Sequence, residues 1–302
     1  MIKKRLQQEG RDLLELVLIP MWAALLPWSW AFRIFKFLAR KDFLYREVTD
    51  RALQEARRWQ WVREGAAEEQ HWRWVRRLTT LVDHADLYLS LTRSDRWMQR
   101  HLRVEGEWPK HDQAAICCTF HWGAGMWGLR HAHTSGLSPA ALVAALQGAH
   151  FKGRFVLYVY ARLRTWAVKR ALHHDTVDVS HSLRPAIQIL RNSGQVMAAV
   201  DVPSDQVASS EVVRIVGIEA RVPKALFRLA AERHLPLWVY STGFSVSDGR
   251  RLLRLKRVDT LDDASLLPTK VFDELSELIG ESPASWHFWS EASRIFLSPD
   301  VS

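Results

Sequence analysis

A histidine follows an apolar run near the middle of the chain. His121 comes directly after residues 114–120, and two glycines follow it within four residues. An imidazole held between a buried strand and a glycine-containing turn can act as a general base. A second polar residue, Asp201, follows another apolar run over residues 195–200. Because ligand sites in open α/β sheets form at the carboxyl ends of the strands, we expect His121 and Asp201 to share one site.

Each of these residues also has a purely structural explanation. A histidine at a strand end can satisfy a buried backbone group. Asp201 precedes Val202 and Pro203, and an aspartate in such a turn can accept backbone N–H bonds. The groups within hydrogen-bonding reach of the two ring nitrogens of His121 therefore distinguish a functional site from these structural roles.

The segments around these residues alternate between strand and helix patterns. Strands alternating with helices indicate an α/β fold, which we expect to have a mixed, largely parallel central sheet flanked by helices. A helical N-terminal region precedes this part of the chain. Strands are predicted over residues 114–120, 140–146, 195–200, 235–242 and 251–258, and helices over the region 42–103 and over residues 126–133, 183–192, 224–233 and 268–280.

The composition narrows the classes of partner. The chain has 302 residues, 48% of them hydrophobic, which is enough for a full core and argues against disorder. The formal net charge of +9 favours an anionic partner, such as nucleic acid, an anionic membrane surface or an acidic substrate. No nucleic-acid-binding motif accompanies this charge, so we expect no nucleic-acid partner.

The N-terminal segment combines aromatic residues with cations. Its longest charge-free stretch, residues 16–32, covers 17 residues and contains two prolines, which is marginal for a membrane-spanning helix. Trp28, Trp30 and Phe37 accompany Arg33 and Lys36, and such a mixture is typical of a segment lying in the lipid headgroup layer. The alternatives are amphipathic helices packed on the protein body and a true span. We expect residues 1–41 to be membrane-interfacial and residues 42–302 to form the α/β domain.

No metal site or cofactor is expected. Cys117 and Cys118 are adjacent in a predicted strand, where their side chains point to opposite faces, so neither a disulfide nor a metal pair forms. Four further histidines have no carboxylate or cysteine near them in the spacing of a metal site. These histidines are His131, His133, His173 and His174.

The histidine block resembles a known motif. The stretch CTFHWGAGMWGL resembles the strand followed by H-x-G-N-W-E that is found in the lysophospholipid/lipid A biosynthesis acyltransferase superfamily. Four further blocks fall in the family's order along the chain. They are LVDHADLYLSL, RPAIQILRNSGQVMAAVDVP, VPKALFRLAAERHLPLWVYSTGF and PASWHFWSEASRIF.

The resemblance implies an acyl transfer from an acyl thioester, carried by acyl carrier protein or coenzyme A, to a hydroxyl or amine of a lipid or glycolipid. It assigns His121 as the general base and places Asp201 at the family's aspartate. It also implies a protein at the cytoplasmic face of a bacterial inner membrane, peripheral or anchored by its N-terminus. Substrate contacts are expected from Gly123 and, because the donor and lipid phosphates are anionic, from the basic residues Arg154, Arg164 and Arg184.

The chain departs from the family motif where an acid should follow the histidine. Met126 occupies that position, and a thioether neither carries charge nor accepts a strong hydrogen bond. Three explanations remain open. Asp201 orients His121 instead, or His121 works without an orienting acid, or the protein is a catalytically inactive member of the fold that binds lipid or scaffolds a complex.

Overall fold

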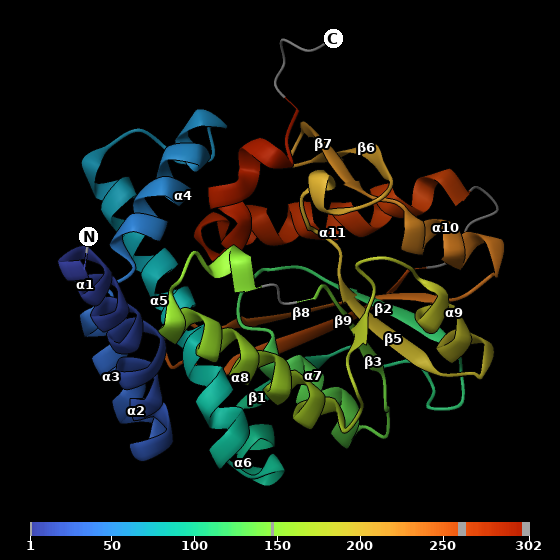
Figure 1. Cartoon of the computed structure of the whole chain (residues 1–302), viewed down its shortest axis with the longest axis horizontal. Helices are drawn as coiled ribbons and strands as arrows, with labels where there is room; N and C mark the ends of the chain where they lie inside the picture. Colours follow the sequence, from blue (N-terminus) through green and yellow to red (C-terminus); the bar gives the residue numbers. More distant parts are fainter. Residues whose placement is uncertain (1, 146–147, 259–263, 298–302) are drawn as a thin grey trace.

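The computed structural model describes residues 2–145, 148–258 and 264–297. Its centre is a seven-stranded sheet in the order β1-β9-β8-β2-β5-β3-β4 (Figure 1). Neighbouring strands are parallel except for β8 and β9. The predicted α/β class and the mixed, largely parallel sheet are therefore confirmed. The strands are β1 (Leu102–Glu105), β2 (Ala115–Thr119), β3 (Ala140–Val143), β4 (Val177–Asp178), β5 (Gln195–Ala199), β8 (Leu237–Phe244) and β9 (Arg251–Val258).

Helices cover both faces of the sheet. Strand β2 is buried throughout, and successive side chains point to opposite faces. Ile116 and Cys118 face the core formed with α9, α10 and α11. Ala115 and Cys117 face the core formed with α7 and α8, so the two cysteines point apart as predicted. The covering helices are α7 (Met126–Thr134), α8 (Phe155–Leu172), α9 (Arg184–Arg191), α10 (Ala225–Glu232) and α11 (Leu267–Glu281).

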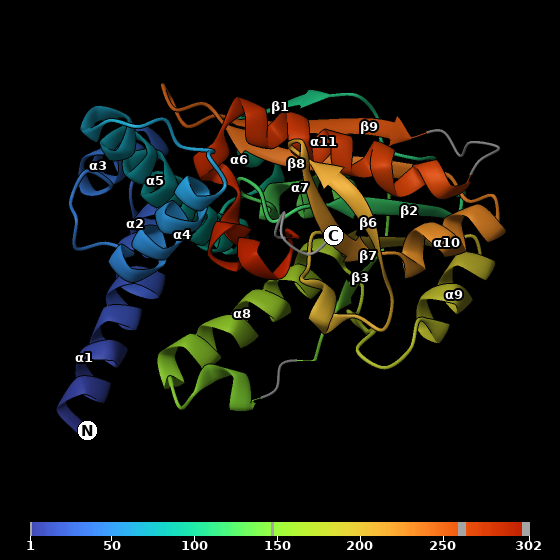
Figure 2. The same ribbon diagram turned by 90° about the horizontal axis from the view of Figure 1, so that it is seen from above.

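A helical N-terminal region lies beside one end of these layers, as Figures 1 and 2 show. Its first helices run almost without a break, and a π-helical turn separates α1 from α2. The predicted domain boundary at residues 41 and 42 falls in the connection between α3 and α4. The elements are α1 (Ile2–Asp12), η1 (Leu13–Leu18), α2 (Ile19–Leu25), α3 (Trp28–Leu38), α4 (Arg46–Arg58), α5 (Ala66–Thr92) and α6 (Asp95–Arg100).

The N-terminal helices share a core with the sheet-covering helices. Phe32 and Phe35 of α3 pack in one buried cluster with Leu78 of α5 and Trp127 of α7. Arg93 closes the end of α2 by donating to the carbonyl oxygens of residues 23, 24 and 26 at 3.0–3.1 Å. Such contacts satisfy carbonyl groups that a helix end leaves without partners. One side of the N-terminal region is therefore an ordinary packed surface.

A buried arginine joins these parts. Arg251, at the start of β9, is fully buried, and its Nε donates to Oδ2 of Asp86 at 3.0 Å. Its guanidinium lies between the rings of Trp28 and Trp127, at 4.4 and 4.7 Å from their centroids. A buried charge is tolerated when it is both paired and stacked in this way.

The opposite side of the N-terminal region carries large apolar side chains in contact with solvent. Within the described residues, no helix combines the length and the apolar character that crossing a bilayer requires. The exposed apolar residues of this region are Leu6, Leu13, Leu18, Trp22, Leu25, Trp30, Phe37 and Phe43.

Several elements were not predicted from the sequence. The basic stretch after β3 forms the 18-residue helix α8. A separate antiparallel hairpin joins β6 (Ser210–Ile215) to β7 (Ile218–Pro223). Its turn residues Val216 and Gly217 both have positive φ, at 50° and 83°, as a two-residue hairpin turn requires. The strand predicted over residues 140–146 ends at Val143, and its last residue, Leu146, lies outside the described residues.

Candidate active site

Two neighbouring strands bring His121 and Asp201 together. Strands β2 and β5 are parallel, and their last residues, Thr119 and Ala199, are register partners. His121 and Asp201 each lie two residues beyond these partners, at the same carboxyl edge of the sheet. The Nδ1 atom of His121 is 2.8 Å from Oδ1 of Asp201. Asp201 is therefore the carboxylate that orients the histidine ring.

The carboxylate of Asp201 is buried and surrounded by donors. It accepts from the backbone N–H of His121 at 2.9 and 3.1 Å and from the indole Nε1 of Trp286 at 2.9 Å. A backbone N–H and an indole N–H can only donate, so the carboxylate oxygens act as acceptors. The remaining interaction, with Nδ1 of His121, then fixes the ring proton on that nitrogen. This leaves Nε2 with a free lone pair, which is the tautomer that a general base requires.

An aromatic residue holds the histidine ring from one side. The ring of Phe288 stacks on His121 with centroids 4.1 Å apart and planes inclined by 18°. The His121 side chain nevertheless keeps 39% of its surface exposed. The imidazole is thus fixed in direction by Asp201 and Phe288 while it stays accessible from solvent.

The C-terminal segment closes over the histidine loop. Its short 3₁₀ turns η5 (Pro283–Ser285) and η6 (His287–Arg294) flank Trp286, which forms an antiparallel bridge with Trp122. The backbone N–H of His287 donates to the carbonyl oxygen of His121 at 2.7 Å. The segment therefore supplies both the indole that binds Asp201 and the ring that stacks on His121.

A buried arginine on α5 fixes this segment in turn. Arg76 donates to the carbonyl oxygens of Trp286 at 2.6 Å and His287 at 2.9 Å. Its side chain is almost fully buried, and burial lowers its pKa to about 10. Arg76 does not reach His121 itself, so its role is to position the residues that do.

Gly123 can occupy its position only as glycine. Its φ is +71°, a left-handed conformation that other residues rarely adopt. A Cβ atom at this residue would lie 2.2 Å from the carbonyl oxygen of Thr242, which belongs to strand β8. The contact is with backbone, so it cannot be relieved by a side-chain rotation.

We expect Gly123→Ala to lower the free energy of unfolding by roughly 2 kcal/mol or more, because strain at positive φ adds to the backbone clash. Urea unfolding followed by circular dichroism measures the change. Gly217→Ala provides the control, since Gly217 also has positive φ (83°) but a Cβ atom there would meet nothing within 4 Å. A loss no larger than that of the control would contradict the clash with Thr242.

His287 is a partly buried histidine that supports the same loop. Its Nε2 donates to the carbonyl oxygen of Gly123 at 2.8 Å. Burial, and next the nearby charge of Arg76, lower the pKa of His287 to about 4. The folded protein therefore keeps this ring neutral at pH values where an unfolded histidine, with a pKa near 6.5, is protonated.

The pKa of His287 predicts a loss of stability in acid. Because the folded pKa lies below the unfolded one, the stability is fully present above about pH 6.5 and is lost as the pH falls through about 4. His287→Gln keeps an amide donor for Gly123 but does not titrate. Between pH 7 and 4, wild type should lose on the order of 2 kcal/mol more than this variant. Equal losses in urea unfolding at the two pH values would contradict the assignment.

Met126 lies in an apolar core. It is the first residue of α7 and is 1% exposed, in the cluster that contains Leu78 and Tyr160. A carboxylate at this position would be buried among apolar side chains, which carries a high desolvation cost. Position 126 therefore holds a residue that packs in the core, and the carboxylate next to His121 comes from the segment that follows β5.

The three arginines expected to bind substrate have different environments. Arg154 pairs with the buried Asp12 through Nε and Oδ2 at 2.8 Å. Arg164 pairs with Asp83 of α5, with two N–O distances of 2.8 Å. Both thus make ion pairs between helices, although the charge of Arg164 still lowers the pKa of His287 as a minor cause. Arg184 is exposed at the first residue of α9.

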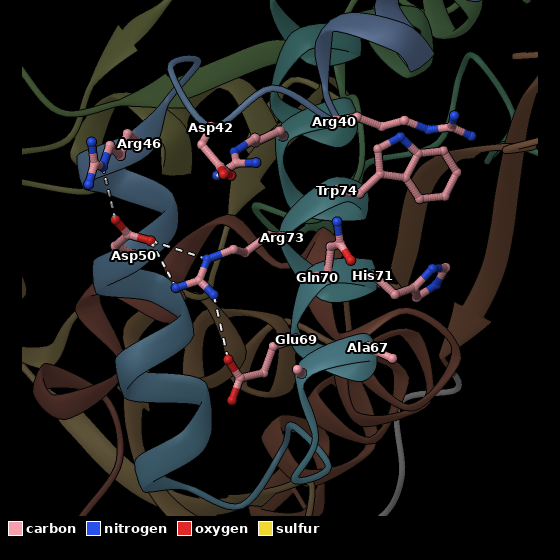
Figure 3. A pocket seen from close by; sticks show the side chains of 12 residues that line it. Arg40, Asp42, Arg46, Asp50, Ala67, Glu69, Gln70, His71, Arg73 and Trp74 are labelled. Carbon is pink, nitrogen blue, oxygen red and sulfur yellow. Dashed lines mark hydrogen bonds and ion pairs between the residues drawn. The ribbon is translucent and has the colours of Figure 1, made fainter.

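A cavity of about 850 Å³ lies apart from His121, between α4 and α5 (Figure 3). Arg77 of α5 lines this cavity. Arg76, the residue before it, points elsewhere and donates to the carbonyl oxygen of Trp286 in the C-terminal segment. The carboxylates in its wall are paired with arginines, as Asp50 is with Arg73 at 3.1 Å. The histidine in its wall, His71, has its ring 5.6 Å from that of Trp74. Its lining includes Arg40, Asp42, Arg46, Asp50, Glu69, Gln70, His71, Arg73, Trp74 and Arg77.

Sequence reasoning identified the histidine and the aspartate but missed three supporting residues. Trp286, Phe288 and Arg76 make the contacts that hold the pair. The density of aromatic residues in PASWHFW is a signal for the first two, whereas nothing in the pattern of α5 singles out Arg76. Neither a family model nor a curated protein matches the sequence.

Proposed function

We propose that this protein is a membrane-associated acyltransferase. It moves an acyl group from a thioester of acyl carrier protein or coenzyme A to a hydroxyl or amine of a lipid or glycolipid. The observation that carries this proposal is the 2.8 Å contact between Nδ1 of His121 and Oδ1 of Asp201 at the carboxyl edge of the sheet. The five sequence blocks that resemble the lysophospholipid/lipid A acyltransferase superfamily, in the same order, give it independent support.

In the proposed reaction His121 acts as the general base. Its Nε2 takes the proton from the acceptor hydroxyl or amine while that oxygen or nitrogen attacks the thioester carbonyl carbon. The resulting imidazolium is stabilised by Asp201, which stays a carboxylate. When the tetrahedral intermediate collapses, the carbon–sulfur bond breaks and the imidazolium returns the proton to the leaving thiolate. One acyl ester or amide and one free thiol are formed, so atoms and charge balance.

The start of α7 is suited to support the developing oxyanion. Gly125 caps this helix without a side-chain hydrogen bond, and it follows His121 by four residues. The N-terminus of a helix carries partial positive charge and backbone N–H groups without partners in the helix. We place the carbonyl oxygen of the thioester near these groups, because preorganised donors of this kind stabilise an acyl-transfer intermediate.

The N-terminal region supports the proposed membrane association. Its inner side packs on α5 and α7, while its outer side exposes residues such as Leu25, Trp30 and Phe37. Lys41 lies 4.8 Å from the ring centroid of Phe37, which joins a cation to the exposed aromatic surface. This arrangement supports an interfacial segment at the cytoplasmic face of a bacterial inner membrane, where a lipid acceptor would be at hand.

Acyl transfer by the full-length protein is the direct test. Palmitoyl-coenzyme A and a palmitoyl acyl carrier protein are supplied with vesicles containing hydroxyl- and amine-bearing lipids, and free thiol and acylated lipid are both measured. The proposal requires equal amounts of the two products, formed by wild type and not by His121→Ala. Thiol release at the uncatalysed rate with every acceptor, while the protein still binds the vesicles, would instead identify an inactive lipid-binding member of the fold.

A further inference from the structure

Helix α8 exposes a line of large apolar side chains. Phe155 is 67% exposed, Val159 46% and Trp166 47%. Their spacings of four and seven residues place all three on one side of the helix. The opposite side of α8 is buried, through residues such as Tyr160 and Ala167. We call Phe155, Val159 and Trp166 the α8 stripe.

The surroundings of the α8 stripe are cationic. The sequence of α8, FVLYVYARLRTWAVKRAL, contains no acidic residue. The guanidinium of Arg162 lies 5.8 Å from the ring centroid of Tyr158, and that of Arg170 lies 5.5 Å from that of Trp166. Aromatic rings with cations stacked on them suit the boundary between headgroups and acyl chains of an anionic lipid layer.

The helix is attached to the N-terminal segment. The carboxylate of Glu9 accepts from the backbone N–H groups of Phe155 at 2.7 Å and Val156 at 2.8 Å, which caps α8. Arg154 pairs with Asp12, as described above. Figure 2 shows α1 and α8 projecting on the same side of the protein body. Leu6 of α1 is also a large apolar residue exposed to solvent, at 67%.

We propose that α8 is a second membrane-contacting element, and that its stripe enters the surface of an anionic bilayer together with the N-terminal segment. This inference rests on the membrane association proposed above and not on the chemistry of His121. Contact through the N-terminal segment alone constrains the orientation of the protein on the membrane less than contact at two sites does. A second contact, far along the chain but fixed to α1 by the carboxylates of Glu9 and Asp12, defines that orientation.

The composition of the stripe favours a membrane over an acidic carrier protein. A carrier with acidic helices is recognised through cations, and the cations near the stripe would serve that role. Recognition of a carrier through cations does not require three large apolar side chains at the surface. Entry into a lipid layer does use them, because removing these side chains from water is its main gain in free energy. The acidic carrier remains a separate outcome of the experiment.

The test uses a fluorescent label at one position of the stripe. Val159→Cys is labelled with an environment-sensitive nitrobenzoxadiazole dye, and Val212→Cys is its matched control. Both are valines, with 46% and 49% of their surface exposed, but Val212 lies in the β6–β7 hairpin. The native cysteines do not compete, because both are fully buried and burial raises the pKa of the Cys118 thiol to about 12.

Vesicles of phosphatidylglycerol should shift the emission of the label at position 159 to the blue and protect it from an aqueous quencher, with no change at position 212. Vesicle binding without a shift at position 159 would overturn the role of α8 while leaving membrane association intact. No binding of the full-length protein to these vesicles would overturn both. A shift caused by acyl carrier protein in the absence of vesicles would assign the stripe to the carrier instead.

A double variant measures how much the stripe contributes. Phe155→Ser with Trp166→Ser removes two exposed rings and should weaken the partition into phosphatidylglycerol vesicles by about tenfold or more, which corresponds to about 1.4 kcal/mol. Val104→Ser with Val246→Ser replaces exposed apolar residues elsewhere and should leave the partition unchanged. Thiol release from a water-soluble donor and acceptor reports separately whether the site is intact. Equal partition of the two double variants would overturn the proposal.

Discussion

Asp201→Asn should lower kcat/KM for acyl transfer by about 10³-fold while the fold is retained. The magnitude follows from triad enzymes, in which the same change costs about 10⁴-fold because the histidine adopts the wrong tautomer. The hydrogen bonds of Asp201 lead to the same change of tautomer in this protein. The asparagine oxygen would accept from the backbone N–H of His121 and from Trp286, so the amide nitrogen would face Nδ1.

An amide nitrogen can only donate, so Nδ1 would have to accept and the ring proton would move to Nε2. The nitrogen that faces the substrate would then be unable to take a proton. The size and shape of the side chain hardly change, so the free energy of unfolding should fall only by the loss of the charge-assisted bonds, about 1–3 kcal/mol. Loss of activity without loss of structure distinguishes an orienting carboxylate from a structural one.

The measurement is thiol release under single-turnover conditions, with circular dichroism and urea unfolding on the same samples. Asp205→Asn is the matched control, because Asp205 is four residues away and makes an exposed ion pair with Arg294. It should keep wild-type activity. An Asp201→Asn protein that is folded and within tenfold of wild type would remove Asp201 from the proposed mechanism.

His121→Ala should lower kcat/KM by about 10²- to 10⁴-fold, the range that general acid–base catalysis contributes. The variant deletes both the base and the ring that stacks on Phe288. Asp201 keeps its bonds from the backbone N–H of residue 121 and from Trp286, so we expect the loop to stay in place. Imidazole added to the solution should restore part of the lost rate, because a free base can enter the space that the side chain vacates.

The control for His121→Ala is His181→Ala, which replaces an exposed histidine elsewhere in the chain. The double variant His121→Ala with Asp201→Asn is informative as well. Residues that act as one unit are strongly non-additive, so the double variant should be no slower than His121→Ala alone. Additive losses would indicate that Asp201 acts on the reaction independently of the histidine, and retained activity in His121→Ala would exclude it as the base.

The alternation of strands and helices determined much of the fold. Apolar runs such as residues 114–120 and 195–200 can only be buried strands in a chain that alternates them with helices, and both are strands in the structure. Parallel strands place their carboxyl ends at one edge of the sheet, so the sequence alone predicts that His121 and Asp201 lie close together. These features depend on local pattern and on simple topology, and a single sequence carries both.

Only the tertiary structure decided what holds the site. Trp286 and Phe288 lie far from His121 in the chain. Arg76 of α5 is farther still along the chain from the carbonyl groups of Trp286 and His287 to which it donates. Arg154 and Arg164 have the same side chain as any exposed, substrate-binding arginine, yet each pairs with a carboxylate on another helix. Hydrophobic periodicity encodes which face of a helix is buried, but the partner of a polar side chain depends on how distant elements pack against one another.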